Sequence, residues 1–177
     1  MIFEDDLRIE EEGYNKVIRP YLQSIGLDSV FIRYSSKQQN VLFNYFNKTR
    51  DIDFITDTGK TNYTISLKVV QHIYNQIFFE TVKNTFTQAK GWAYYSQADY
   101  LFYLMLDEGQ HSNFKLIITD FKLLRNLDLS SYKTAFGKTT SKSGKLLYKT
   151  EGKLIPLKDF KHKVINRIET RDEVILK

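Results

Sequence analysis

The stretch that decides the fold covers residues 50–70 and reads RDIDFITDTGKTNYTISLKVV. Residues 50–56 alternate polar and apolar side chains, residues 57–60 have turn chemistry, and residues 62–70 form a second β-prone run, so we predict an antiparallel hairpin. Such a hairpin brings Asp53 near the 66–68 region at one end of a sheet. Two interpretations are open here: an edge hairpin with solvent-facing charges, or a site for a divalent metal ion.

The remaining sequence alternates between helical and strand patterns. Polar residues 35–47 are expected to form an exposed loop, and the polar segment at about 130–145 a flexible basic excursion. The predicted helices cover residues 5–25 (bent or divided at Pro20, ending at Gly26), 91–98 (a short helix or turn), 120–127 and 157–168; the further strands cover 29–34, 76–82, 100–106, 113–118 and 153–156. This order predicts an α/β sandwich with a mixed central sheet flanked by helices.

Composition limits the classes of protein to consider. A chain of 177 residues with 42% hydrophobic residues is expected to form a single globular domain over 1–177. The absence of cysteine excludes disulfides, thiolate zinc sites and cysteine nucleophiles. The sequence has neither a membrane-spanning apolar run nor a signal-peptide pattern, so we expect a soluble cytoplasmic protein without membrane contact.

The positive charge is concentrated near the C-terminus. The formal net charge is +5, yet residues 131–163 alone hold nine lysines and two acids. Such a segment can neutralise phosphates, and the alternative is a solvated lysine-rich tail. We expect contact with nucleic acid through five of these lysines: Lys133, Lys138, Lys142, Lys145 and Lys149.

Several common motifs are absent. The triplets at 59–61 and 137–139 (both GKT) lack the glycine that a phosphate-binding loop needs five residues before its second glycine. The three histidines share no metal-ligand spacing, and no serine lies in a glycine-flanked nucleophile elbow. These patterns disfavour a nucleotide triphosphatase, a histidine zinc site and a serine hydrolase.

Four stretches together resemble a known family. DIDF at 51–54, SLK at 66–68, IFFE at 77–80 and GWAYYSQADYLFYL at 91–104 occur in the order found in the phage-encoded branch of the PD-(D/E)XK nuclease superfamily. That superfamily is similar to Holliday-junction resolvases and restriction endonucleases. The resemblance implies a restriction-endonuclease-like α/β sandwich and, for a phage-encoded protein, the host-cell cytoplasm.

The resemblance also implies roles for particular residues. Asp53 matches the metal-binding aspartate, Lys68 matches the signature lysine, and the main-chain carbonyl of Leu67 is a further metal ligand. Ser66 stands where the family has Glu or Asp, which is the main departure from the pattern. If the site is only weakened by that departure, Ser66→Glu should raise its activity.

Two other acids are candidates to compensate for Ser66. Glu80 ends the IFFE run. Glu11 lies on the helical stripe expected to face the sheet, although acids in a first helical turn also simply favour the helix dipole.

The expected function is therefore a metal-dependent DNA endonuclease or resolvase-like nuclease that uses Mg²⁺ or Mn²⁺. Asp53, Glu80 and Leu67 would hold the metal, and Lys68 and Glu11 would complete the catalytic set. The alternative is a catalytically inactive nuclease-fold protein that binds nucleic acid or another protein. A structural protein of a phage or mobile element without a DNA role is a third reading, and whether the chain forms a homodimer stays open.

Overall fold

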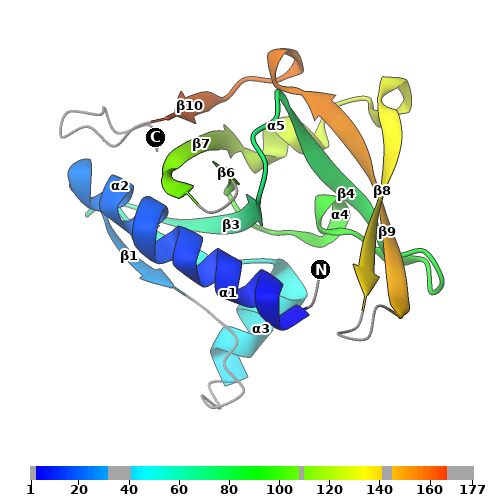
Figure 1. The fold of residues 1–177 in the computed structure, drawn as a ribbon. Helices are drawn as coiled ribbons and strands as arrows, with labels where there is room; N and C mark the ends of the chain where they lie inside the picture. The colour runs from blue at the N-terminus through cyan, green and yellow to red at the C-terminus, as the bar shows by residue number, and fades with distance from the viewer. Residues whose placement is uncertain (1–2, 32–40, 108–109, 141–144, 167–177) are drawn as a thin grey trace.

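The computed structural model describes residues 3–31, 41–107, 110–140 and 145–166, which form a mixed α/β fold made mostly of strand (Figure 1). The described strands form two sheets. The larger has the order β1 (Asp28–Phe31), β2 (Phe54–Asp57), β3 (Asn62–Val70), β6 (Tyr100–Asp107), β7 (Gln110–Asp120), β10 (Lys163–Ile165). The smaller has the order β5 (Ala89–Lys90), β4 (Gln76–Asn84), β9 (Leu146–Pro156), β8 (Lys133–Thr140).

The larger sheet is mixed, as the sequence predicts. β3 and β6 pair in parallel, with Ile65 opposite Tyr100 and Lys68 opposite Tyr103, whereas the other described pairs of this sheet are antiparallel. A parallel pair needs a long crossover, and here the crossover contains β4, β5 and α4 (Trp92–Tyr95). β6 is buried on both faces, which explains its continuous apolar sequence.

One face of the larger sheet is covered by the N-terminal helical segment (Figure 1). This segment consists of α1 (Phe3–Gly13), a π-helical stretch (Tyr14–Ile18) and α2 (Arg19–Ser24). It packs closely, because a Cβ on Gly13 would lie 2.9 Å from Cδ2 of Leu104. The predicted stop is confirmed: Gly26 has φ of 73°, a conformation that favours glycine.

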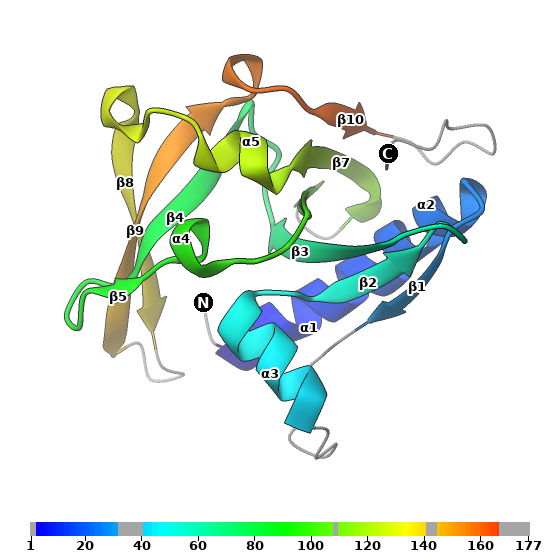
Figure 2. The same cartoon turned by 180° about the vertical axis from the view of Figure 1, so that it is seen from behind.

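The other face of the larger sheet packs against the smaller sheet and two short helices (Figure 2). This second core joins Leu101 and Tyr103 of β6 to Phe79 of β4, Trp92 of α4 and Phe121 of α5 (Phe121–Arg125). The layers are therefore helix, sheet and sheet, so a second sheet covers much of the face on which helices were expected.

Three predicted elements are wrong within the described residues. Residues 41–50 form a helix, α3 (Val41–Arg50), where a loop was expected, and residues 133–140 form β8 instead of a flexible excursion. The predicted helix from 157 is replaced by a 3₁₀ turn (Leu157–Asp159) and β10, which extends the larger sheet beside β7. The expectations for 32–40, 141–144 and 167–168 lie outside the described residues.

No helix in the described part of the chain is long and apolar enough to span a membrane. Another short 3₁₀ turn, Leu129–Ser131, precedes β8.

Candidate functional site

Asp51 and Asp53 lie in the connection from α3 to β2. The Asp53 N–H donates to the Ile65 carbonyl at 2.8 Å, which fixes this connection against β3. Asp51 has φ of 53°, in the left-handed region that Asp tolerates better than most residues. Both aspartates are buried, with 6% and 8% of their surface exposed. The backbone of this connection therefore directs Asp51 and Asp53 into the interior, although neither residue lies on a strand.

β3 supplies the partners of these acids. Ser66 Oγ donates to Asp51 Oδ2 at 2.6 Å, and Lys68 Nζ donates to Asp51 Oδ1 at 2.6 Å. Lys68 Nζ also lies 3.7 Å from Asp53 Oδ2. Because alternate residues of a strand point to the same face, Ser66 and Lys68 reach the acids from one side of the sheet. We call Asp51, Asp53, Ser66 and Lys68 the acid cluster.

Two further donors hold Asp53. The Leu67 main-chain N–H donates to Asp53 Oδ2 at 2.7 Å, and Asn47 Nδ2 donates to Asp53 Oδ1 at 2.7 Å. All four carboxylate oxygens of the two aspartates thus accept a hydrogen bond from the protein. The geometry of the cluster is fixed by these bonds before any ligand arrives.

The electrostatics of the cluster follow from its burial. The pKa of Asp53 is raised from 3.8 to about 6. Burial is the largest cause, Lys68 opposes the rise, and the Asp51 carboxylate adds to it. Burial alone would lower the pKa of Lys68, but the carboxylates of Asp51 and Asp53 raise it above its ordinary value. Lys68 is therefore a permanent ammonium ion, and two aspartates share its single positive charge.

The walls of the cluster come from the crossover between β3 and β6. Lys68 Nζ lies 5.6 Å from the ring centroid of Trp92, within cation–π range. Burial raises the pKa of Glu80, and the Lys68 ammonium opposes that rise. Glu80 therefore interacts electrostatically with the same ammonium as Asp51 and Asp53. Burial and then Asp51 likewise raise the pKa of Tyr95.

Gly91 determines how closely this wall packs. A Cβ at position 91 would lie 2.3 Å from the Glu80 carbonyl oxygen. Gly91 N also donates to the Thr81 carbonyl at 2.8 Å, and α4 begins at the next residue. The glycine lets α4 rest on β4 and places Trp92, a member of the second core, beside Lys68.

The structure brings some of the predicted residues together and separates others. Asp53, Lys68 and the main chain of Leu67 meet in the cluster, and Glu80 lies within electrostatic reach of it. Glu11 is solvent-exposed, so its predicted inward orientation is wrong, whereas the half-buried Glu10 raises the pKa of Lys68. Tyr14, Ile18 and Leu22 of the predicted stripe are buried, so the departure is confined to its first residue, Glu11.

The predicted nucleic-acid-binding lysines lie on a separate element. Lys133 and Lys138 are on β8 and Lys149 is on β9, while Lys145 directly precedes β9. Lys142 lies outside the described residues.

Sequence reasoning missed Asp51 and Asn47. Asp51 was visible in the DIDF stretch, but strand alternation assigned it the same orientation as Asp53 without a role. Its left-handed backbone, and not its position in a strand, sets its direction. Asn47 was missed because α3 was expected to be a loop.

The oxygen donors of the cluster match a hard divalent cation. Mg²⁺ commonly uses one or two protein carboxylates and completes its shell with water and substrate phosphate oxygens. Two buried carboxylates against one ammonium leave an excess negative charge, which a cation would offset. The described residues contain no group of three or more His, Cys, Asp or Glu side chains arranged to hold a metal ion. The described residues therefore form no dedicated protein cage, and a cation at Asp51 and Asp53 would need its other ligands from water or substrate.

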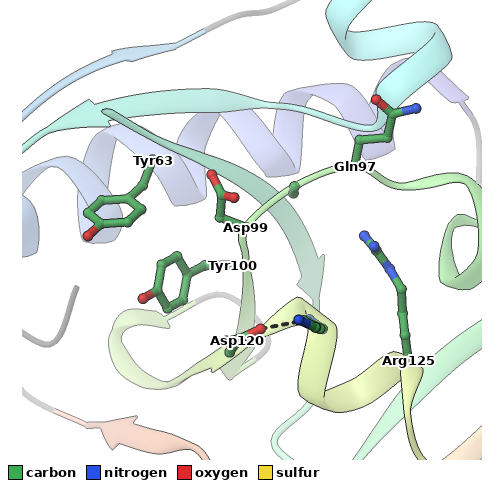
Figure 3. A pocket seen from close by; sticks show the side chains of 8 residues that line it. Tyr63, Gln97, Asp99, Tyr100, Asp120 and Arg125 are labelled. Carbon is green, nitrogen blue, oxygen red and sulfur yellow. Dashed lines mark hydrogen bonds between the residues drawn. The ribbon is translucent and has the colours of Figure 1, made fainter. Parts of the chain in front are cut away.

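A cavity of about 520 Å³ is lined by none of the residues of the acid cluster (Figure 3). Tyr63 and Tyr100 lie on one side of it and Arg125 lies on the other (Figure 3). Asp99 Oδ2 accepts hydrogen bonds from the main-chain N–H and the hydroxyl of Thr64 at 2.8 and 2.7 Å. Asp99, which lines the cavity, therefore holds the first part of β3 in place.

Comparison with known proteins gives no relative: no family model, curated protein or solved structure matches this chain.

Proposed function

We propose that this protein is a metal-dependent deoxyribonuclease that hydrolyses phosphodiester bonds. The proposal rests on one observation: Asp51 and Asp53 are buried together and share one ammonium, Lys68. Buried charges are normally paired one to one, because an uncompensated charge is costly in the interior. An excess carboxylate at a polar cluster is typical of a site that functions with a bound cation.

Asp51 supplies what Ser66 lacks. The family resemblance calls for an acid at position 66, and Ser66 Oγ instead holds the carboxylate of Asp51 at 2.6 Å. A carboxylate is thus present beside the β3 main chain even though residue 66 does not carry it. This arrangement supports activity in spite of the departure at Ser66.

Lys68 would act as a charge stabiliser. Because its pKa is raised, it cannot serve as a general base near neutral pH. A fixed ammonium can instead stabilise the negative charge that develops on the phosphate oxygens. Mg²⁺, when bound, would supply Lewis-acid polarisation and an activated water. Asn47 and Leu67 N–H would keep Asp53 oriented, and Trp92 would shield the ammonium from solvent.

The direct test is cleavage of supercoiled, branched and single-stranded DNA in Mg²⁺ or Mn²⁺, with EDTA as the blank. We expect metal-dependent cleavage that is reduced at least about 100-fold, the usual scale for loss of one preorganised charge contact, by Asp53→Asn and by Lys68→Met. Asp159→Asn, an exposed acid outside the cluster, serves as the matched control and should cleave normally. Absence of cleavage on all three substrates, or undiminished cleavage by Asp53→Asn, would overturn the proposal.

One observation favours a second candidate, a non-catalytic nucleic-acid-binding protein. All four oxygens of Asp51 and Asp53 already accept hydrogen bonds, so the cluster is also consistent with a purely structural role. In that case DNA binding would be salt-sensitive, would survive Asp53→Asn, and would not be accompanied by cleavage.

A further inference from the structure

The hairpin formed by β8 and β9 carries an arrangement that the acid cluster does not explain. Lys138 and Lys149 are directly opposite each other in the antiparallel register. Like charges in this position repel across the strands and destabilise the pair. Neither lysine forms an ion pair with another described residue. The two opposed lysines therefore destabilise the isolated protein, and a bound anion would offset their repulsion.

An exposed aromatic ring lies next to this pair. Phe136 is two residues before Lys138 on β8, so both side chains leave the same face of the sheet. Its surface is 62% exposed, although it is one of the largest apolar side chains. Phe136 is opposite Glu151, and Lys149 is the diagonal neighbour on the same face. We call Phe136, Lys138 and Lys149 the hairpin patch.

The hairpin patch shares its face with the second core. Along β9, residues 149, 151, 153 and 155 alternate onto one face, and the register with β8 is regular from Lys133 to Thr139. Ile155 of that face is fully buried against the second core. The face is thus covered near Ile155 and exposed at Phe136 and Lys138.

That face also leads toward the acid cluster. Phe79 of β4 is paired with Lys153 of β9. Its ring packs edge-to-face on Trp92, with ring centroids 4.9 Å apart, and Trp92 lies beside Lys68. A strand bound on the hairpin patch would therefore lie on the face of the smaller sheet that contacts Trp92, the neighbour of Lys68.

A second aromatic residue lies beside the hairpin. The Thr85 N–H donates to the Lys149 carbonyl at 2.9 Å, which holds the turn after β4 against β9. The next residue, Phe86, is 66% exposed. Lysines with exposed aromatic rings are the two elements of single-strand recognition, in which bases stack on rings and cations follow the phosphates.

We propose that the hairpin patch binds single-stranded DNA, with one unpaired base stacked on Phe136 and adjacent phosphates on Lys138 and Lys149. In an intact duplex the bases are stacked on one another and cannot cover an isolated ring on a β-sheet, whereas the lysines would serve any nucleic acid. The inference deepens the proposed function, because it makes single-stranded or frayed DNA the substrate class. The binding step itself does not depend on cleavage.

The test is fluorescence anisotropy with labelled single-stranded and duplex oligonucleotides of equal length, in EDTA, using the Asp53→Asn protein so that cleavage is blocked. Single-stranded DNA should bind more tightly than duplex. Phe136→Ala should weaken single-strand binding about 5- to 100-fold, the range expected for loss of one stacked base, and should affect duplex much less. Phe136→Tyr should restore it. Tyr74→Ala, an exposed aromatic at the opposite end of β4, is the matched control and should bind normally.

The lysines are tested by salt dependence. Replacing both Lys138 and Lys149 by alanine should reduce the slope of log K against log salt by about 1.4 for single strands, or about 0.7 per phosphate contact. The same double change at Lys158 and Lys161, exposed lysines beyond β9, should leave the slope unchanged. Phe136 is exposed, so Phe136→Ala should retain its melting temperature, and the double lysine variant should not melt at a lower temperature, because it loses only a like-charge repulsion. Circular dichroism checks both.

The inference would be overturned by equal affinity for single strands and duplex, by no loss on Phe136→Ala, or by binding to anionic vesicles in preference to DNA. Its failure is distinguishable from failure of the proposed nuclease. Cleavage without single-strand preference would sink the inference alone, and single-strand binding without metal-dependent cleavage would sink the nuclease alone. RNA oligonucleotides in the same assay show whether the 2′-hydroxyl is tolerated; tighter binding of RNA than of DNA would contradict the substrate class.

Discussion

Ser66 and Asp51 are joined by a buried 2.6 Å hydrogen bond across 15 residues of sequence. Ser66 is fully buried, so residue 66 has no space for a longer side chain while Asp51 is in place. The expectation that Ser66→Glu alone raises activity is therefore replaced by a coupled prediction.

A carboxylate at position 66 should support cleavage only when Asp51→Ser and Ser66→Glu are combined. Asp51→Ser should abolish cleavage, and Ser66→Glu alone should destabilise the fold by adding a third carboxylate beside Asp51 and Asp53. The double variant should melt at a higher temperature than Ser66→Glu alone and regain part of the activity. Melting curves and plasmid cleavage check this. Additive losses in the double variant would show that the two positions do not exchange roles.

Removal of Lys68 should be costly. Lys68→Met leaves Asp51 and Asp53 buried without their cation, which typically costs about 3–5 kcal/mol in unfolding free energy. Urea denaturation at pH 8 measures this. The loss should be smaller at pH 5, where Asp53, with a pKa of about 6, is largely protonated. Lys60→Met in the exposed β2–β3 turn should change stability by less than about 0.5 kcal/mol. An equal loss at both pH values would contradict the assigned charge state.

The pKa of Asp53 also predicts how stability depends on pH. The native state holds a proton on Asp53 between pH 3.8 and about 6 that the unfolded chain has lost. The free energy of unfolding therefore falls as pH rises through this window, by up to about 3 kcal/mol for a shift of about two pH units.

Asp53→Asn should remove that dependence. The groups facing Asp53 are Asp51, Lys68 and Asn47, and all three remain in the variant. Urea denaturation in EDTA at pH 4.5 and 7.5 should show the variant gaining stability relative to the natural chain at the higher pH. A constant difference between the two proteins would rule out the raised pKa.

Gly91 should tolerate no side chain. Gly91→Ala places a methyl group 2.3 Å from the Glu80 carbonyl, so α4 must move away from β4. Trp92 would then leave Lys68, which fluorescence of this single tryptophan can report. We expect a lower melting temperature and a red-shifted emission. Gly59→Ala, whose Cβ meets nothing within 4 Å but whose φ is 76°, separates backbone strain from the steric clash. Unchanged emission in Gly91→Ala would contradict the packing argument.

The sequence predicted the strands that have a clear β-prone run. β3 was predicted with its observed bounds, because β-prone residues continue from 62 to 70 and glycine marks the turn before it. β8 was missed because neither of its faces is fully buried, so no apolar alternation appears, and only its threonines indicated a strand. The final helix was wrong because docking of residues 163–165 against β7 overrides local helical spacing.

For the site, the sequence predicted that Asp53 and Lys68 would be neighbours, since hairpin register places them together. The alternation of residues 50–56 was consistent with the shared inward orientation of Asp51 and Asp53, but it assigned Asp51 no role, because the family resemblance rests on Asp53. Helical spacing predicted the buried positions of Tyr14, Ile18 and Leu22, but not the exposure of Glu11 at the start of the same stripe.

The parallel pairing of β3 with β6 also sets an order of assembly. Asp51 meets Ser66 and Lys68 across only 15 and 17 residues, whereas Lys68 meets Tyr103 only after the whole crossover has been placed. Shorter loops close at lower entropic cost and earlier in folding. The charged centre can thus form in the nascent hairpin while its tryptophan wall is still in solvent. In refolding experiments, emission from Trp92 should reach its native value only with the last phase, when the second sheet closes over β6.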